Sequence, residues 1–188
     1  MEEQIRNVIK NSIELHENLY GITDKIAAAA KMMNQCITAG GKIMFAGNGG
    51  SAADAQHLAA ELVNRFLKQR KPLPGLALST DTSILTAIGN DFSFDEVFSK
   101  QVEALGRQGD VFLGISTSGN SANIISAFEA AGRSGVSTIA LTGAGGRMAD
   151  MADCIIAVPS SITPRIQEAH ILIGHILCEI IEEVQCPM

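Results

Sequence analysis

Residues 42–66 read KIMFAGNGGSAADAQHLAAELVNRF, and this stretch decides the fold. A short apolar run, KIMFA, stops at the glycine-rich segment 47–51, and a helix-like stretch follows it. The same unit recurs at 111–135, where VFLGI stops at STSGNS and ANIISAFEAAGRSG follows. Short apolar strands that alternate with helices predict a parallel sheet with helices on both faces.

Three more apolar runs predict strands at 75–79 (GLALS), 137–142 (STIALT) and 154–158 (CIIAV). Five strands indicate an α/β protein with a flavodoxin-like doubly wound parallel sheet. Such sheets bind ligands at the carboxyl ends of their strands, where both Ser/Gly-rich loops lie. A long closing helix is predicted from about Pro164 to Val184, because proline is well tolerated at a helix start.

Apolar residues at helical spacing predict two helices ahead of the first strand, over residues 2–20 and 23–39. We expect them to form an N-terminal helical hairpin that packs on the sheet or on another subunit. No segment is long enough or sufficiently rich in linker residues to divide the chain. We therefore expect one domain over 1–188, with helices over 1–39 and the α/β core and closing helix over 40–188.

The composition indicates which kinds of partner the protein binds and in which cellular compartment it lies. The chain has a formal net charge of −6 and a pI near 5.2, which is the opposite sign to a general nucleic-acid surface. No secretory signal is visible, and no apolar run approaches the roughly 18 residues that span a bilayer. The four cysteines show no C-x-x-C spacing, which is typical of reduced thiols. We expect a cytoplasmic protein that binds neither nucleic acid nor membrane.

The loop after the 111–115 strand has the features of a phosphate site. Hydroxyl groups from Ser116, Thr117, Ser118 and Ser121 would converge with backbone N–H groups at the start of a helix, where the helix dipole favours an anion. The alternative is that Ser121 only caps the helix. The loop at 47–51 lacks both a G-x-G-x-x-G spacing and a Lys-Ser/Thr ending, which disfavours nucleotide binding; it remains open whether it is only a tight turn.

A second group of polar residues is suited to a divalent metal. His57 and Glu61 are four residues apart, on one face of the predicted helix. The closing helix adds Gln167, His170 and His175, and the first and last of these lie about 12 Å apart along the axis. Imidazole and carboxylate are zinc ligands. The alternative is a solvated polar face, since spacing alone does not show that the two helices meet.

Together these segments resemble the sugar isomerase (SIS) domain family and, within it, the phosphoheptose isomerases. The resemblance runs from Gly40 to about Ile181. The segment GISTSGNS marks the superfamily, whereas the combination of His57, Glu61, Gln167 and His175 marks the isomerases. The segments that carry it are GNGGSAADAQHLAAEL, AIGNDFSFDEVFSKQVEALGRQGD, GISTSGNSANII, ALTG and RIQEAHILIGHIL.

The resemblance implies an aldose–ketose isomerase that converts sedoheptulose 7-phosphate into D-glycero-D-manno-heptose 7-phosphate through an enediol, for heptose in lipopolysaccharide or other surface glycans. It implies a homotetramer with active sites between subunits, and a bound zinc ion. Glu61 and His175 would be the catalytic base and acid. The implied zinc ligands are His57, Glu61, Gln167 and His175. The implied substrate contacts are Asn48, Gly49, Gly50, Ser51, Glu61, Arg65, Asn90, Asp91, Ser116, Thr117, Ser118, Ser121 and Gln167.

Two other functions stay open. One is a non-catalytic replication-initiation factor of the same family that binds the initiator DnaA, and the other is a phosphosugar-sensing regulator. Glu61 and His175 favour the enzyme, because the replication factor tends to lose the metal-site glutamate. The sequence departs from the isomerase pattern at Pro164, where an Asp is usual, and at HLAAEL, which has one acidic residue in place of two.

Overall fold

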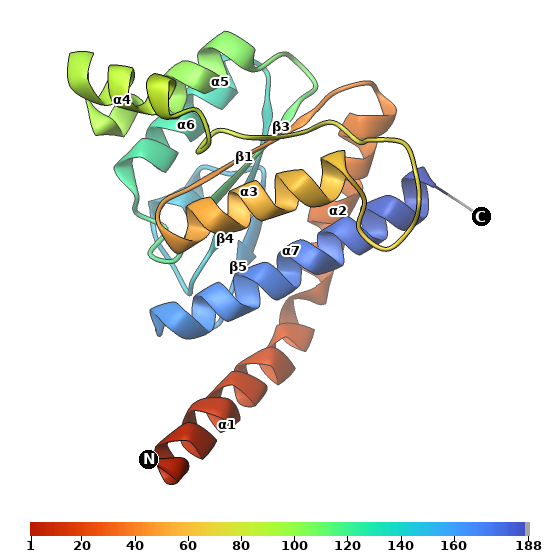
Figure 1. Ribbon diagram of the computed structural model, residues 1–188, viewed down its shortest axis with the longest axis vertical. Helices are drawn as coiled ribbons and strands as arrows, with labels where there is room; N and C mark the ends of the chain where they lie inside the picture. The colour runs from red at the N-terminus through yellow and green to blue at the C-terminus, as the bar shows by residue number, and fades with distance from the viewer. Residues whose placement is uncertain (187–188) are drawn as a thin grey trace.

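The computed structural model describes residues 1–186 and contains the predicted five-stranded parallel sheet (Figure 1). The strand order is β2-β1-β3-β4-β5, the flavodoxin-like order, so this prediction is confirmed. The central strand β3 is buried along its whole length, as expected for a parallel sheet covered on both faces. The strands are β1 (Ile43–Gly47), β2 (Gly75–Ala77), β3 (Val111–Ser116), β4 (Ser137–Thr142) and β5 (Cys154–Ala157).

Helices cover the sheet in two layers, each with its own apolar cluster. Alternate residues of a strand point to opposite faces, so Phe45 and Leu113 belong to one cluster while Met44 and Phe112 belong to the other. The first cluster lies under α2 (Thr23–Thr38), α3 (Gly50–Val63) and α7 (Thr163–Gln185). The second lies under α5 (Ser99–Leu105) and α6 (Ala122–Arg133).

The two N-terminal helices are present, but the predicted hairpin is wrong. A short 3₁₀ helix, η1 (Leu19–Ile22), joins α1 (Glu2–Asn18) to α2. Asn18 and Thr23 keep right-handed helical dihedral angles, so the chain bends without reversing. The start of α1 and the end of α2 consequently lie at opposite ends of the molecule (Figure 1). Most of α1 is exposed, whereas α2 buries one face, because it packs on α7 and β5.

The segment between β2 and β3 holds helices that the apolar pattern did not reveal. They are α4 (Thr82–Asp91), the 3₁₀ helix η2 (Phe94–Glu96) and α5, and a further 3₁₀ helix, η3 (Arg147–Asp150), follows β4. A cap signal for α4 was available in the sequence, because the Asp81 carboxylate accepts a hydrogen bond of 2.9 Å from the Ile84 N–H. Within residues 1–186, no helix is long and apolar enough to cross a bilayer.

Candidate functional site

The two Ser/Gly-rich loops lie side by side at the carboxyl edge of the sheet. Strand β1 pairs with β3 so that Gly47 is opposite Ile115, and each loop begins at the next residue. The side-chain amides of Asn48 and Asn123 join the loops through two reciprocal hydrogen bonds, each 2.9 Å long. Asn123 is buried in the first turn of α6. The amide pair therefore holds a predicted substrate residue of the first loop against the helix that follows the second.

Three of the four predicted hydroxyl groups of the second loop converge, and only that of Thr117 makes no hydrogen bond to the others within residues 1–186. The Ser116 Oγ lies 2.9 Å from the Ser121 Oγ and 3.3 Å from the Ser118 Oγ. Ser121 is the N-cap residue of α6, yet its side chain makes no capping hydrogen bond. The alternative that Ser121 only caps the helix thus has no support in the geometry. The Ile124 N–H donates to the Ser121 carbonyl at 3.1 Å, which leaves the N–H groups of Ala122 and Asn123 for an anion beside three hydroxyls.

We expect the substitution Ser121→Ala to raise KM for a phosphosugar tenfold or more and to leave the fold intact. A hydroxyl that contacts a charged phosphate contributes about 1.5–3 kcal/mol, whereas no capping bond is lost. Steady-state kinetics and thermal unfolding of the variant test this. A wild-type KM would show that Ser121 does not contact the phosphate. Ser126→Ala, on the same helix, is the matched control.

The segment that follows β4 closes over the phosphate loop. Gly143 N–H donates to the Thr117 carbonyl at 3.2 Å, and Met148 N–H donates to the Gly119 carbonyl at 3.0 Å. Gly119 has a φ of +64°, and a Cβ there would lie 3.0 Å from the Gly146 Cα and overlap the Gly145 carbonyl. This contact has no local signal in the sequence, because it joins segments that only the fold brings together.

Helices α3 and α7 run side by side in the same direction and bring two predicted ligands together (Figure 1). The Nε2 atoms of His57 and His175 are 2.9 Å apart, and the Glu61 Oε1 lies 3.4 Å from the same His57 nitrogen. The phenyl ring of Phe66 packs on His175 with ring centroids 5.5 Å apart. The two helices therefore meet at these residues, but the pair is exposed, so the metal role stays a prediction beside the alternative of a solvated polar face.

The donor types of this cluster fit a zinc ion, which takes imidazole nitrogen and carboxylate oxygen. Two ring nitrogens that face each other at 2.9 Å repel as acceptors, so one of them must be protonated or both must share a cation. No three His, Cys, Asp or Glu side chains within residues 1–186 have the arrangement of a ready-made metal centre. The cluster thus consists of the ring nitrogens of His57 and His175 with the Glu61 carboxylate nearby. Zinc binding by these residues stays a prediction.

Gln167 and His170 lie away from the His57–His175 pair. A Cβ at Gly50 would be 2.5 Å from the Gln167 Nε2, so Gln167 contacts the glycine loop, about 10 Å along α3 from His57. Within one chain this placement favours its predicted substrate role over its predicted metal role. His170 is fully buried with its Nε2 3.1 Å from the Thr142 carbonyl. Burial lowers the pKa of His170 to about 4, and this residue is not a substitute ligand in this arrangement.

Of the other predicted substrate contacts, some lie in the glycine-rich loop and the rest lie on the exposed surface. Gly49, Gly50 and Ser51 begin α3 beside the phosphate loop. Arg65 is exposed just beyond α3. Asn90 and Asp91 are exposed at the end of α4, which projects from the sheet at the side away from α7 (Figure 1). A single chain does not bring these two residues to the phosphate loop.

Two residues near the site were not predicted. Asn123 gave no signal, because its pairing with Asn48 depends on the fold. Asp54 lies one helical turn before His57, and the shared face of Asp54, His57 and Glu61 was a signal available in the sequence. The Asp54 Oδ2 is buried without a hydrogen bond among residues 1–186. Burial raises the Asp54 pKa to about 6, against a lowering effect of His57.

Comparisons with known proteins agree on one family. The SIS domain family matches residues 7–143. The phosphoheptose isomerase of Rhodospirillum rubrum is 55% identical over 99% of this chain and 100% of its own length. The solved phosphoheptose isomerase GmhA from Neisseria gonorrhoeae is 49% identical with a TM-score of 0.92, over 97% of this chain and 98% of its own. The one from Francisella tularensis is 42% identical with a TM-score of 0.93, over 96% and 97%.

Proposed function

The chain belongs to the SIS domain family and, within it, to the phosphoheptose isomerases, and from this premise we propose that it converts sedoheptulose 7-phosphate into D-glycero-D-manno-heptose 7-phosphate. One observation carries the proposal. The hydroxyl loop lies at the carboxyl edge of the sheet beside the start of α3, and His57, which faces His175, lies about two turns farther along α3. A heptose phosphate likewise carries its phosphate and its carbonyl at opposite ends of an extended chain.

In the proposed reaction, the phosphate loop anchors the substrate and the cluster moves the proton. The Glu61 carboxylate removes the proton from the carbon beside the carbonyl. An enediol intermediate forms as the proton of the neighbouring hydroxyl group moves to the former carbonyl oxygen. His175 then delivers a proton to the former carbonyl carbon, and Glu61 and His175 return to their starting states by exchange of one proton through solvent. The Nε2 of His175 faces His57, so the proton it delivers is assigned to Nδ1. The contact of the Phe66 ring with His175 helps to orient the imidazole.

Zinc is the proposed cofactor, held by His57, Glu61 and His175. When bound, the ion would polarise the substrate carbonyl and stabilise negative charge that develops on it. We expect metal analysis to find about one zinc ion per chain, and chelation to abolish most activity until zinc is returned. Full activity in a preparation verified to be free of metal would contradict this role.

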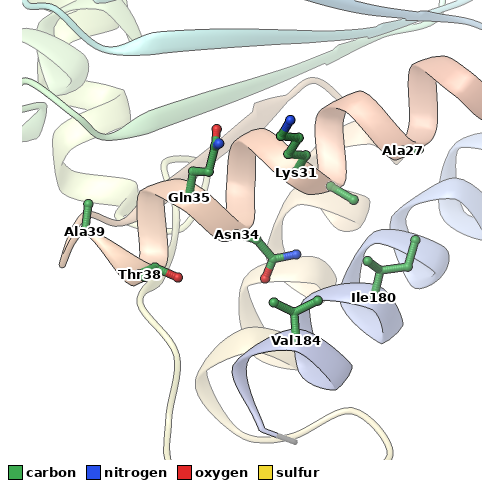
Figure 2. Close-up of a pocket in the computed structure, with 9 residues that line it drawn as sticks. Ala27, Lys31, Asn34, Gln35, Thr38, Ala39, Ile180 and Val184 are labelled. Carbon is green, nitrogen blue, oxygen red and sulfur yellow. The ribbon is translucent and has the colours of Figure 1, made fainter.

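We further propose a homotetramer with active sites between subunits. A groove of about 630 Å³ lies between α2 and α7. Figure 2 shows Asn34 of α2 turned toward Ile180 and Val184 of α7 in this groove. Exposed apolar side chains line α1 at Ile5, Ile9 and Ile13, and a single chain leaves Asn90 and Asp91 away from the loops. Association would cover these surfaces.

We expect light scattering at micromolar concentration to give four times the chain mass of 19.8 kDa, since each chain buries too little of its α1 and α2 surface alone. A charged substitution in the groove, Ile180→Glu, should lower this mass, whereas Glu129→Lys, on the exposed face of α6, should not. A wild-type mass near one chain would contradict the tetramer.

The function itself is tested by turnover of sedoheptulose 7-phosphate in deuterated water. We expect product formation with deuterium at the carbon that exchanges its proton. The relatives reported above are named for the isomerase, and nothing in the comparisons supports the replication-initiation factor. Absence of turnover on any phosphoheptose would restore that alternative. A cytoplasmic role in heptose supply for lipopolysaccharide or surface glycans follows from the proposed reaction, because a phosphosugar does not cross a bilayer unaided.

A further inference from the structure

A buried ion pair lies behind the catalytic end of α3. The side chains of Glu182 in α7 and Arg70 in the loop after α3 are each 2% exposed. The Glu182 Oε1 accepts hydrogen bonds from the Phe66 N–H at 2.9 Å and the Arg70 Nε at 2.8 Å. Its Oε2 accepts from the N–H groups of Leu67 and Lys68, both at 2.7 Å. Four donors therefore converge on one carboxylate.

Arg70 links Glu182 to α3, the helix that contains His57 and Glu61. Its Nη2 donates to the Glu61 carbonyl at 2.7 Å, and its Nη1 donates to the Leu62 carbonyl at 2.8 Å. These carbonyls belong to the last turn of α3, where helix carbonyls lack partners and a cation is favourable. The guanidinium thus caps α3 at the residue to which the proposed base belongs.

The segment held by Glu182 carries two further residues of the site. Arg65 immediately precedes the three bound N–H groups, and Phe66 contributes the first of them while its ring packs on His175. One carboxylate therefore connects α7, the loop after α3 and, through Arg70, the backbone of Glu61. Burial alone would raise the pKa of Glu182, but the hydrogen bonds from Phe66, Lys68, Leu67 and Arg70 hold it below its usual range.

We propose that Glu182 and Arg70 are positioning residues for the proton transfer, which hold Glu61 and the Phe66–His175 contact in the geometry that the reaction needs. The inference rests on the proposed isomerase function. Its physical basis is that a displacement of about 1 Å in a reacting group can reduce a rate about 10²-fold. A buried ion pair is by itself weak evidence of net stability, since apolar residues of similar volume often replace one without loss.

The experiment compares three proteins with the wild type, after the wild type has been shown to turn over sedoheptulose 7-phosphate. Glu182→Gln keeps the size but places an amide N–H₂ against backbone N–H donors. The double substitution Arg70→Met with Glu182→Leu removes both charges and keeps an apolar fill. Asp110→Asn is the matched control, because Asp110 is a buried carboxylate whose partners, Lys42 and the Arg107 N–H, lie outside α3, α7 and the loop after α3.

We expect Glu182→Gln and the double variant to lower kcat about tenfold or more. KM should change less than about threefold, because these hydrogen bonds of Glu182 and Arg70 run to residues 61–70 and not to the phosphate loop. Asp110→Asn should lower the unfolding temperature comparably and leave kcat near the wild-type value. If Glu182→Gln does not fold, kcat of the double variant alone tests the positioning role. A folded double variant with wild-type kcat would overturn the inference, and so would an equal loss of kcat in Asp110→Asn. A wild type without turnover overturns the proposed function instead.

Discussion

Glu61→Gln should lower kcat by about 10² to 10⁴, the range typical for the loss of a general base. The Glu61 side chain is one-fifth exposed and its Oε1 lies 3.4 Å from the His57 Nε2. Glutamine keeps the size of the side chain and removes the ionised oxygen that takes the proton. The substrate would still bind through the phosphate loop, so KM should change much less than kcat.

Steady-state kinetics of the purified variant tests this, with thermal unfolding to show that the fold is retained. The control is Glu103→Gln, which removes an exposed carboxylate that pairs with Arg133 on the opposite face of the sheet. Surface pairs of this kind contribute little, so activity and stability should stay near wild type. Normal turnover in Glu61→Gln would remove the proton-transfer mechanism proposed above, and a metal analysis of the same variant would show whether zinc was lost with the carboxylate.

The sheet could be predicted from the sequence, because an apolar run between a glycine-rich loop and a helix leaves few alternatives. The direction that the chain takes through η1 could not be predicted. Gly21 interrupts the helical pattern, but it does not indicate whether the second helix folds back on the first or continues in the same direction. The approach of His57 to Glu61 followed from their four-residue spacing on one helix. The approach of His57 to His175 depends on how α3 packs on α7, where the missing side chain of Gly174 admits Leu58.

Some residues of the site have no local signal at all. In the sequence, Glu182 is one of several acids near the end of a long helix, and nothing near it indicates that four donors meet there. Asn123 is likewise one polar residue within a helix. Each acquires its role from a contact with a segment more than seventy positions away. Such residues are found only after the fold is known.

Gly119→Ala should lower kcat/KM by about 10² or more, because it disrupts the phosphate loop without removing any side chain that contacts the substrate. Gly119 has a φ of +64°, which an L side chain rarely adopts. The new methyl group would overlap the Gly145 carbonyl and lie 3.0 Å from the Gly146 Cα. Both neighbours are backbone atoms, so the loop must move away from the hydroxyls of Ser116 and Ser121. The loss of two contacts to a charged phosphate, at about 1.5–3 kcal/mol each, accounts for the magnitude.

The measurement is the binding of inorganic phosphate by calorimetry together with steady-state kinetics, and both should weaken in Gly119→Ala. Gly132→Ala is the matched control, since Gly132 lies in α6 with open space around its Cβ position and a negative φ. Alanine there should stabilise the helix by about 0.5–1 kcal/mol and leave phosphate binding unchanged. Wild-type phosphate affinity in a folded Gly119→Ala protein would mean that the loop tolerates the movement, and that the anion is held by groups other than the Ser116–Ser121 hydroxyls.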